Sequence, residues 1–283
     1  MRCHNLNRLM IDLSPSNLDR LLAESKDVAT AAGAIAMRYF SPGAATSARV
    51  WSKDGGSPVT EADIAVDDFL KARCAEIVPS ARWLSEETAD DPGRLGQRLV
   101  WVVDPIDGTR AFMAGLPDWG VCVALLADNQ PVIGIVLAPA LNRTYAASLG
   151  QGATRNADPI RAEPERGRAP RIAGPKPMLD ALAQVFDFAP QPKVPSLALR
   201  LARIAEGSLD GGLISPDSRD WDLAAADLIL SEAGGTVTTL QGERLAFNRA
   251  RPVHGTLVAA GNEGHPALLA AANTMRDRAF SRI

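Results

Sequence analysis

The sequence is poor in cysteine and histidine, and this scarcity excludes two classes of site. The three cysteines are widely spaced, form no CxxC pair and are typical of free buried thiols in a reducing compartment: Cys3, Cys74 and Cys122. The three histidines are equally scattered along the chain. We therefore expect no disulfide framework, no zinc site and no histidine-rich metal centre.

Long hydrophobic runs are also missing. No segment approaches the roughly 18 to 20 unbroken apolar residues that span a membrane. The opening segment, MRCHNLNRLMIDLSPS, has no apolar stretch of signal-peptide length. The formal net charge of −3 gives no general attraction to nucleic acid or an anionic membrane. We expect a cytoplasmic protein that binds neither, and that holds any anionic substrate through a local positive centre such as a metal ion.

The composition is that of an ordinary globular protein. The chain has 283 residues, of which 46% are hydrophobic and 22% charged, so it fits one large or two modest domains. Ser16, with Asp19 three residues later, predicts the start of a helix that stops at the Ser-Pro-Gly of residues 41–43. A second helix is predicted from about Thr60 to Val78.

From residue 99 the pattern becomes that of β-strands. Short runs rich in valine and isoleucine predict strands at residues 99–104, 120–127 and 131–138. Asp128-Asn129 is a turn signal between the last two of these strands. Residues 150–160 predict another turn with a following strand.

The second half of the chain alternates helices and strands. Residues 161–195 hold many prolines and arginines with little periodicity, so we place a domain junction there and expect subdomains at residues 1–165 and 166–283. The later segments indicate an α/β layer, with helices at 197–206, at 221–233 and after Pro266, and strands at 209–214, 235–240 and 256–260.

The most informative segment is LVWVVDPIDGT, residues 99–109. An apolar strand ends in Asp104, turns at the following proline and presents Asp107 before Gly108. Two carboxylates held close together repel one another unless a cation lies between them, and oxygen ligands suit Mg²⁺. Gly108 lets the backbone approach a ligand, and the N–H groups of Gly108 and Thr109 are then available to phosphate oxygens. Either aspartate alone fits a simple acidic turn, whereas the whole segment favours a metal site.

Two further acidic segments are compatible with this interpretation. Glu86 and Glu87 directly follow a short apolar strand, and Asp220 and Asp222 open a strongly apolar helix. Acids at a helix start are often only favourable partners of the helix dipole, which is the alternative for Asp220. Glu87 fits equally a solvated neighbour of Glu86.

The motifs SEET, DPIDGT and WDLAAADLILSEAGG occur in the order and spacing of the inositol monophosphatase superfamily, which the chain resembles from its first helix to its final strand. In the first motif, Ser85 replaces the usual glycine. The resemblance implies a layered αβαβα sandwich of two subdomains, of mixed α/β and α+β character. It also implies Mg²⁺ as cofactor (roughly two or three ions), inhibition by Li⁺ and a homodimer.

The resemblance also implies roles for individual residues. Thr109 resembles the threonine that orients the attacking water, Asp63 the acid that pairs with it, and Glu87 the acid beside the first metal ligand. For Asp63, a charge in the first turn of the second helix is an equally good interpretation. The expected metal ligands are Glu86, Asp104, the backbone carbonyl of Ile106, Asp107 and Asp222.

The substrate is expected to be a small phosphorylated metabolite, with contacts implied at Gly108, Thr109, Ser196, Arg200 and Asp222. The segment KDGGSPVTEAD, residues 53–63, resembles the 3′(2′),5′-bisphosphate nucleotidase branch, and no acid falls in register for inositol hydroxyls at residues 211–217. This favours a nucleotide bisphosphate, whose second phosphate Arg200 would contact. The alternative for Arg200 is a solvated helix residue.

Two other functions remain open at this point. One is an inositol-1-phosphate or sugar-phosphate phosphatase. The other is a catalytically silent regulator that binds metal or nucleotide. All the expected metal carboxylates and Thr109 are present, which favours an enzyme. The absence of a plausible histidine or cysteine nucleophile favours direct attack by water.

Overall fold

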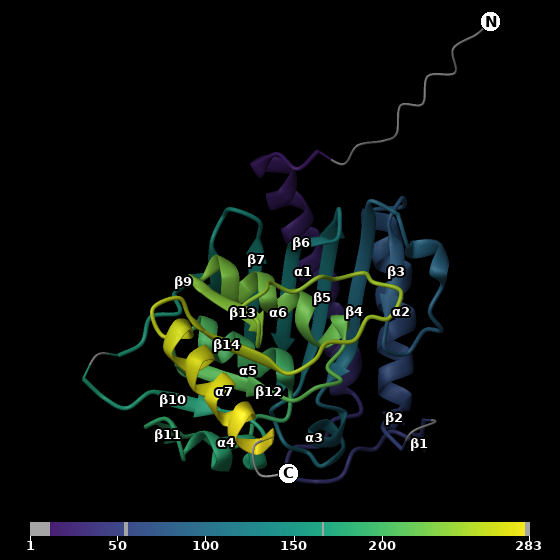
Figure 1. Cartoon of the computed structure of the whole chain (residues 1–283). Helices are drawn as coiled ribbons and strands as arrows, with labels where there is room; N and C mark the ends of the chain where they lie inside the picture. Colours follow the sequence, from purple (N-terminus) through teal and green to yellow (C-terminus); the bar gives the residue numbers. More distant parts are fainter. Residues whose placement is uncertain (1–11, 54–55, 166, 281–283) are drawn as a thin grey trace, which may run out of the picture.

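A computed structural model describes residues 12–53, 56–165 and 167–280 and shows five stacked layers (Figure 1). Helices α1 and α2 cover one face of a seven-stranded sheet. Helices α5 and α6 lie between that sheet and a five-stranded one, whose outer side is covered by α4 and α7. The predicted αβαβα sandwich is therefore confirmed. The helices are α1 (Pro15–Met37), α2 (Glu61–Ile77), α3 (Thr109–Met113), α4 (Lys176–Leu182), α5 (Leu197–Ala205), α6 (Asp220–Glu232) and α7 (His265–Phe280).

The larger sheet follows the chain from β3 to β9 in sequence order. Only β3 and β4 within it are parallel among the described strands, and the other neighbours are antiparallel. Its strands are β3 (Arg82–Ser85), β4 (Leu99–Asp107), β5 (Gly120–Ala127), β6 (Gln130–Ala138), β7 (Arg143–Ser148), β8 (Ala153–Arg155) and β9 (Asp158–Ile160).

The smaller sheet has the order β11-β10-β12-β14-β13 and mixes parallel and antiparallel pairs. A separate hairpin joins two short strands ahead of α2. The smaller sheet contains β10 (Arg171–Ala173), β11 (Ala189–Pro190), β12 (Gly211–Ile214), β13 (Gly235–Thr239) and β14 (Leu257–Gly261), and the hairpin contains β1 (Val50–Ser52) and β2 (Pro58–Thr60).

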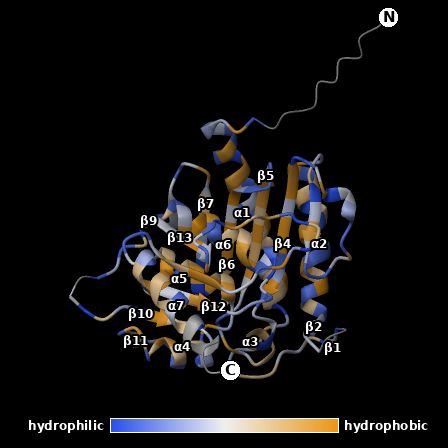
Figure 2. Ribbon diagram, in the orientation of Figure 1, coloured by the Kyte–Doolittle hydropathy of each residue, from blue (hydrophilic) through white to orange (hydrophobic). Residues whose placement is uncertain are grey.

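The two larger apolar clusters lie on the two faces of the larger sheet, and a smaller one lies between the smaller sheet and the helices α4 and α7. Every residue of β4 and β5 is buried, because helices cover these strands from both sides. Figure 2 shows the resulting contrast between the hydrophobic central strands and the more hydrophilic outer helix α2. The strands are therefore continuous apolar runs instead of alternating ones, and polar residues at their ends are held by rigid backbone.

The predicted helices are present with shifted ends. Helix α1 begins at Pro15 with Ser14 as its N-cap, so the start predicted at Ser16 is wrong by two residues. Proline suits the first helical position, because its missing N–H would be unpaired there anyway. The helix ends at Met37, before residues 41–43. Helix α2 has Thr60 as its N-cap, close to the predicted start.

The strands at residues 120–127 and 131–138 are confirmed, and Asp128 and Asn129 join them with φ values of 50° and 64°. Sequence reasoning missed β7, and residues 150–160 form two short strands where one was predicted. The stretch 161–195 contributes β10, α4 and β11 to the second half of the fold. The division at residue 165 stays a prediction.

Two of the three cysteines are free and buried, as predicted. They are Cys74 and Cys122, whereas Cys3 lies outside the described residues. Among the described helices, none combines the length and apolar character that crossing a bilayer requires.

Candidate active site

The site is built on the end of β4. Instead of stopping at Asp104, as predicted, the strand continues to Asp107 through an irregularity in its pairing with β5. The irregularity lies between the two aspartates, and the Asp104 carboxylate accepts a hydrogen bond of 3.0 Å from the Ile106 N–H. A bulge of this kind re-aims side chains. Both acids therefore belong to the rigid strand and not to a loose turn.

Gly108 and α3 follow immediately. Gly108 has a φ of 93°, and a Cβ there would lie 3.1 Å from the Asp118 carbonyl oxygen. A side chain at this position would therefore be both strained and crowded. Helix α3, which the sequence did not predict, begins at Thr109, so that its first N–H groups have no partner within the helix.

Asp107 is held by the start of α5. Its carboxylate accepts hydrogen bonds from the Ser196 hydroxyl at 2.5 Å, from the Ala198 N–H at 2.7 Å and from the Leu197 N–H at 3.2 Å. Ser196 is buried, and its hydroxyl also accepts from the Leu199 N–H as the N-cap of α5. The structure thus places Ser196, an expected substrate contact, against the carboxylate.

Asp222 reaches the same point from the third position of α6, where its carboxylate accepts a hydrogen bond of 2.7 Å from the Arg219 N–H. Asp104, Asp107 and Asp222 each offer one oxygen, and these three oxygens lie within 4.8 Å of one another. Two sheet residues and one helix residue, up to 118 positions apart in the chain, thus form one acidic cluster. We call these three residues the acidic triad.

The acidic triad has no ion-paired counter-charge among the described residues, although the charges of Arg219 and Arg200 act on it from further away. No ion pair joins it to a lysine or arginine in the described part of the chain. Burial, together with the neighbouring carboxylates, raises the pKa of Asp104 and of Asp222 well above the ordinary range. For Asp107, burial raises the pKa to about 6 against the opposing effect of its three hydrogen bonds.

These properties fit a bound metal ion. The triad offers oxygen atoms only, which is the donor set of hard cations such as Mg²⁺. A divalent cation among the three carboxylates would supply the missing positive charge and relieve both the repulsion and the cost of burial. The fold therefore brings together three of the expected metal ligands, Asp104, Asp107 and Asp222.

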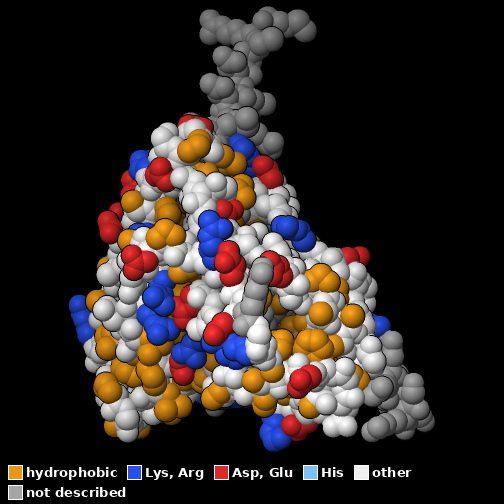
Figure 3. Space-filling model, turned by 90° about the vertical axis from the view of Figure 1, so that its left-hand side faces the viewer, with side chains coloured by type: hydrophobic (Ala, Val, Ile, Leu, Met, Phe, Trp, Pro, Cys, Tyr) orange, Lys and Arg blue, Asp and Glu red, His pale blue; other side chains and the backbone are white. Residues whose placement is uncertain are grey.

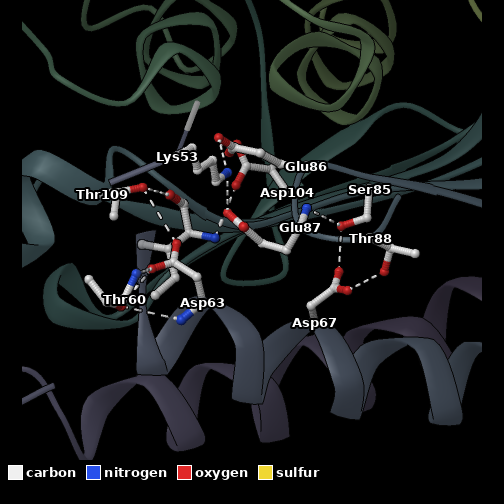
Figure 4. A network of polar contacts seen from close by, with 11 residues as sticks. Lys53, Thr60, Asp63, Asp67, Ser85, Glu86, Glu87, Thr88, Asp104 and Thr109 are labelled. Atoms are coloured by element: carbon white, nitrogen blue, oxygen red, sulfur yellow. Dashed lines mark hydrogen bonds and ion pairs between the residues drawn. The ribbon is translucent and has the colours of Figure 1, made fainter. Parts of the chain in front are cut away.

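Glu86 lies at the edge of this cluster with a different partner. It follows β3, and its carboxylate contacts the Lys53 ammonium at 2.9 Å, while Glu87 contacts the same ammonium at 2.6 Å (Figure 4). The side chain of Glu87 is 4% exposed, and burial raises its pKa to about 7. Glu87 is therefore a buried group that can carry a proton near neutral pH, which its alternative as a solvated neighbour does not describe.

Thr109 and Asp63 meet as expected. The Thr109 hydroxyl lies 3.5 Å from the Asp63 carboxylate and 3.1 Å from the Ile106 carbonyl oxygen (Figure 4). The other oxygen of Asp63 accepts hydrogen bonds from the Thr60 N–H at 2.8 Å and the Thr60 hydroxyl at 2.6 Å. Asp63 is fully buried, and burial raises its pKa to about 6. It therefore serves both as a capping residue of α2 and as a partner of Thr109.

Two cavities meet at Asp222. The first has a volume of about 260 Å³ and is lined by Ser57, Pro58, Glu86, Asp104, Asp107, Gly108, Thr109, Arg110, Lys193, Pro195 and Asp222. The second has a volume of about 620 Å³, extends towards α4 and the loop after β12, and shares Lys193, Pro195 and Asp222 with the first. The acidic cavity is thus adjacent to this larger one, which we call the larger chamber.

Arg200 lines the larger chamber and is 9% exposed. Its Nε has no hydrogen-bond partner, and no acid lies within ion-pair distance of its guanidinium among the described residues. Burial lowers its pKa, with Asp107 acting in the opposite direction. The alternative of a solvated helix residue is therefore wrong, because Arg200 is a buried cation that faces the chamber without a partner.

Sequence reasoning missed the contacts of three residues near the acids. Lys53 pairs with Glu86 and Glu87 across more than 30 positions, and no local pattern reveals such a pair. Asp67 and Ser85 bond one another, and two signals were available for them. Asp67 lies four residues after Asp63, hence on the same face of α2, and Ser85 departs from the family pattern.

The model of the inositol monophosphatase family matches residues 17–276. The histidinol-phosphatase of Mycobacterium tuberculosis is 33% identical over 209 residues, which make up 69% of this chain and 78% of that protein. The 3′(2′),5′-bisphosphate nucleotidase CysQ of Aggregatibacter actinomycetemcomitans is 32% identical over 219 residues, or 72% of this chain and 80% of its own. The solved IMPase of Thermotoga maritima shares the fold, with a TM-score of 0.78 at 24% identity over 92% of this chain and 99% of its own. The chain is thus similar to phosphatases that are named for different substrates.

Proposed function

The chain belongs to the inositol monophosphatase family of phosphatases, and from this premise we propose that it is Mg²⁺-dependent and hydrolyses a nucleoside 3′(2′),5′-bisphosphate. The observation that carries the proposal is the junction of the two cavities. The acidic triad, which has no ion pair among the described residues, adjoins a chamber that contains a buried arginine without a described partner. The first suits a metal ion with a phosphate, and the second suits another anionic group.

The metal would be held by Glu86, Asp104, the Ile106 carbonyl, Asp107 and Asp222. When bound, Mg²⁺ supplies a lowered pKa for a coordinated water and neutralises charge on the phosphate. Such a role requires ionised carboxylates, and bound metal favours ionisation of acids whose pKa burial has raised.

Thr109 is suited to orient the attacking water. Its hydroxyl proton is directed to Ile106 or Asp63, at 3.1 and 3.5 Å, so its lone pairs remain free to accept a hydrogen bond from water. Asp63 is itself immobilised by the two hydrogen bonds from Thr60. Glu87, with a pKa of about 7, can take up a proton at neutral pH.

A covalent enzyme intermediate on cysteine is disfavoured by the surroundings of Cys122. This residue pairs with Asp104 in the sheet, and burial followed by the nearby carboxylates raises the pKa of its thiol well above the ordinary value. A protonated thiol is a poor nucleophile. Water is therefore the proposed nucleophile.

The charges of the larger chamber favour a substrate with a second anion. Lys193 and Arg200 line it and have no acidic partner in the described part of the chain, whereas Lys176 is already paired with Asp180 at 2.8 Å. Histidinol phosphate carries a protonated amine, which two unpaired cations would repel. A nucleoside bisphosphate would instead bring a phosphate that matches the guanidinium.

One observation favours inositol phosphate as a second candidate. The loop after β12 brings Asp217 to the lining of the chamber, where a carboxylate could accept hydrogen bonds from polyol hydroxyls. The register of residues 211–217 did not lead us to expect an acid there. Asp217 has a φ of 75°, so this aspartate occupies a left-handed conformation.

Phosphate release from a substrate panel tests the proposal. The panel contains adenosine 3′,5′-bisphosphate, adenosine 3′-monophosphate, inositol 1-phosphate, histidinol phosphate and fructose 1,6-bisphosphate, each with Mg²⁺ and with a chelator. We expect the highest kcat/KM for adenosine 3′,5′-bisphosphate, and no release with the chelator. A higher value for inositol 1-phosphate or histidinol phosphate would contradict the substrate assignment. No release from any compound, by folded protein that binds Mg²⁺, would favour the silent regulator.

Arg200→Met sharpens the test. A hydrogen bond to a charged group contributes about 1.5–3 kcal/mol, so kcat/KM for the bisphosphate should fall by roughly 10- to 100-fold. The 3′-monophosphate lacks the second phosphate and serves as the matched control, since its kcat/KM should stay nearly unchanged. Equal losses for both compounds would mean that Arg200 supports the site in general and does not read a second phosphate.

A further inference from the structure

Helix α2 carries a second buried carboxylate that has no assigned role. Asp67 lies one turn after Asp63 and is 3% exposed. In Figure 4 both acids rise from this helix, Asp63 towards Thr109 and Asp67 towards the turn that follows β3. One oxygen of Asp67 accepts a hydrogen bond from the Ser85 hydroxyl, and the other accepts one of 2.5 Å from the Thr88 hydroxyl.

These contacts have a fixed direction. A carboxylate oxygen accepts hydrogen bonds, so each hydroxyl must give its only proton to Asp67. The Ser85 oxygen then keeps its lone pairs, and it accepts the Glu87 N–H at 3.3 Å. Ser85 and Thr88 stand at the two ends of the turn that contains Glu86 and Glu87. A single carboxylate therefore holds both ends of this turn.

We propose that Asp67 is a positioning residue, which acts through Ser85 and Thr88 to hold Glu86 and Glu87 in the orientation that the metal site needs. The proposal rests on the proposed function, since it concerns the same site. A glycine at position 85 has no hydroxyl and gives the backbone more freedom, so the contact depends on the serine that departs from the family pattern. In this chain a serine that is hydrogen-bonded to Asp67 thus takes the place of a more flexible glycine next to Glu86 and Glu87.

Asp67 also carries charge near the site, and a second explanation of any effect is direct attraction of the metal ion. The two explanations differ in their dependence on Ser85. If Asp67 acts through its hydrogen bonds, removing Asp67 or Ser85 should weaken the site, and removing both should add only the part that Thr88 carries. If the charge acts through space, the effect of Asp67 should persist when Ser85 is absent.

The experiment is a double-mutant cycle in the full-length chain. Asp67→Asn keeps the size of the side chain, but its amide nitrogen cannot accept a hydrogen bond, so at least one hydroxyl loses its acceptor. The other variants are Ser85→Gly, the double variant and Asp68→Asn. The last removes a neighbouring exposed acid on the same helix and is the charge-matched control. The Mg²⁺ dissociation constant is measured by calorimetry, and kcat and KM are measured with the best substrate of the panel.

Residues that orient metal ligands typically change metal affinity by 10- to 100-fold, so we expect about 10-fold weaker Mg²⁺ binding for Asp67→Asn and a similar loss for Ser85→Gly. The double variant should bind no more than about twofold more weakly than either single one. Asp68→Asn should bind as the unchanged protein does. The loss of activity should lie in kcat at saturating substrate and be partly recovered at high Mg²⁺.

Three results would overturn the proposal. The first is an Asp67→Asn affinity equal to that of Asp68→Asn, and the second is a full Asp67→Asn effect in the Ser85→Gly background. If Asp67→Asn does not fold, Ser85→Gly and Thr88→Val remove the donors instead, and unchanged Mg²⁺ binding by both is the third. Absence of phosphatase activity would contradict the proposed function alone. Calorimetry measures Mg²⁺ binding without turnover, so it tests the role of Asp67 independently of activity.

Discussion

Glu206 and Asp210 also have buried side chains, of which 3% is exposed in each case, and each is paired with two arginines. Asp104, Asp107 and Asp222 have no such partners in the described chain. The pKa values move in opposite directions: they are lowered for Glu206 and Asp210 and raised for the triad. Burial raises the pKa in both groups, and for Glu206 and Asp210 the hydrogen bonds and charges of their partners outweigh this effect.

Glu206 shows how partners within the chain stabilise the charge of a buried acid. Burial alone would raise its pKa, but hydrogen bonds from Arg155, Ser208 and Tyr145 and the charge of Arg143 outweigh burial and lower it. The Arg155 contact measures 2.8 Å and the Arg143 contact 3.2 Å. Such a site is complete within the chain and has a structural role.

Paired charges are also visible at the surface. The face in Figure 3, on the side of β9 and β10, carries positive and negative side chains intermixed, with no field of one sign. Arginine supplies the partners of Glu206 and Asp210, namely Arg143, Arg155, Arg168 and Arg171. The triad is left without it, and an acid cluster that the chain does not neutralise itself indicates a ligand that does.

The largest expected effect comes from Asp104→Asn. The variant removes one charge without changing volume, and loss of several kcal/mol of charge stabilisation should lower kcat/KM by on the order of 10³-fold. Without metal its thermal stability should stay the same or rise, because repulsion within the triad is reduced. Activity and thermal unfolding of the metal-free variant check both parts. Near-normal turnover would contradict the metal assignment.

The second prediction concerns pH. The folded-state pKa of Asp107 is about 6 against an ordinary value of 3.8, so between about pH 4 and 6 the metal-free folded protein keeps a proton that the unfolded chain releases. The free energy of unfolding due to this group must therefore fall as the pH rises through that window. Glu206 and Asp210 act in the opposite sense, since their contribution is lost as the pH falls.

Mg²⁺ should therefore stabilise the protein more at pH 8 than at pH 5. At 100 times its dissociation constant, a ligand adds about 2.7 kcal/mol, which is a Tm increase of roughly 5–10 °C for a chain of this size. At pH 5 protons compete for the carboxylates, and the increase should be about half as large. Thermal unfolding with and without Mg²⁺ at both pH values measures this. An equal increase at both would show that the triad does not bind the ion.

Contacts between residues close together in the sequence were easier to predict than contacts between distant ones. Asp104 and Asp107 lie three positions apart at the end of an apolar run, so their proximity was predictable, and so was the Asp222 helix. The order of layers followed from the family resemblance. The continuation of β4 to Asp107 was not predictable, because the apolar pattern stops at Asp104 while pairing with β5 resumes at Asp107.

The partners of charged residues were the part that could not be predicted. Lys53 meets Glu86 across 33 positions, and Arg203 meets Asp118 across 85. Only the fold decides that these pairs form and that the Nε of Arg200 has no partner among the described residues. Arg200 was assigned to solvent as an alternative because a charge on a helix is normally exposed. The structure buries it, since α5 lies between two sheets.

A smaller effect is expected on the paired side of the comparison. Glu206→Gln should lower the free energy of unfolding by about 2 kcal/mol, less than a fully buried pair costs, because the two arginines keep 37% and 40% of their side chains exposed. Urea unfolding measures this loss. The kcat should stay unchanged, since the group contacts no residue of the triad. A large loss of turnover at unchanged stability would assign Glu206 to the site and remove the contrast.

The smallest effect is expected at Lys53. This residue combines features of the paired and the unpaired acids, because it is a cation of the chain that contacts two acids of the site. Its ammonium contacts Glu86 and Glu87 at 2.9 and 2.6 Å. Lys53→Met should cost the metal-free protein about 1 kcal/mol, as for other partly exposed pairs. It should strengthen Mg²⁺ binding by about fivefold, because the ion no longer competes with the ammonium for Glu86.

Arg49→Met is the control for this variant, since Arg49 precedes the same hairpin but pairs with the more exposed Glu61 at 3.2 Å. Its Mg²⁺ affinity should not change. Weaker Mg²⁺ binding by Lys53→Met would mean that the ammonium supports the site instead of competing with the ion. Glu86 would then belong with the acids that the chain itself neutralises, and only the triad would be left for a ligand. Glu86 would have to be removed from the proposed metal ligands.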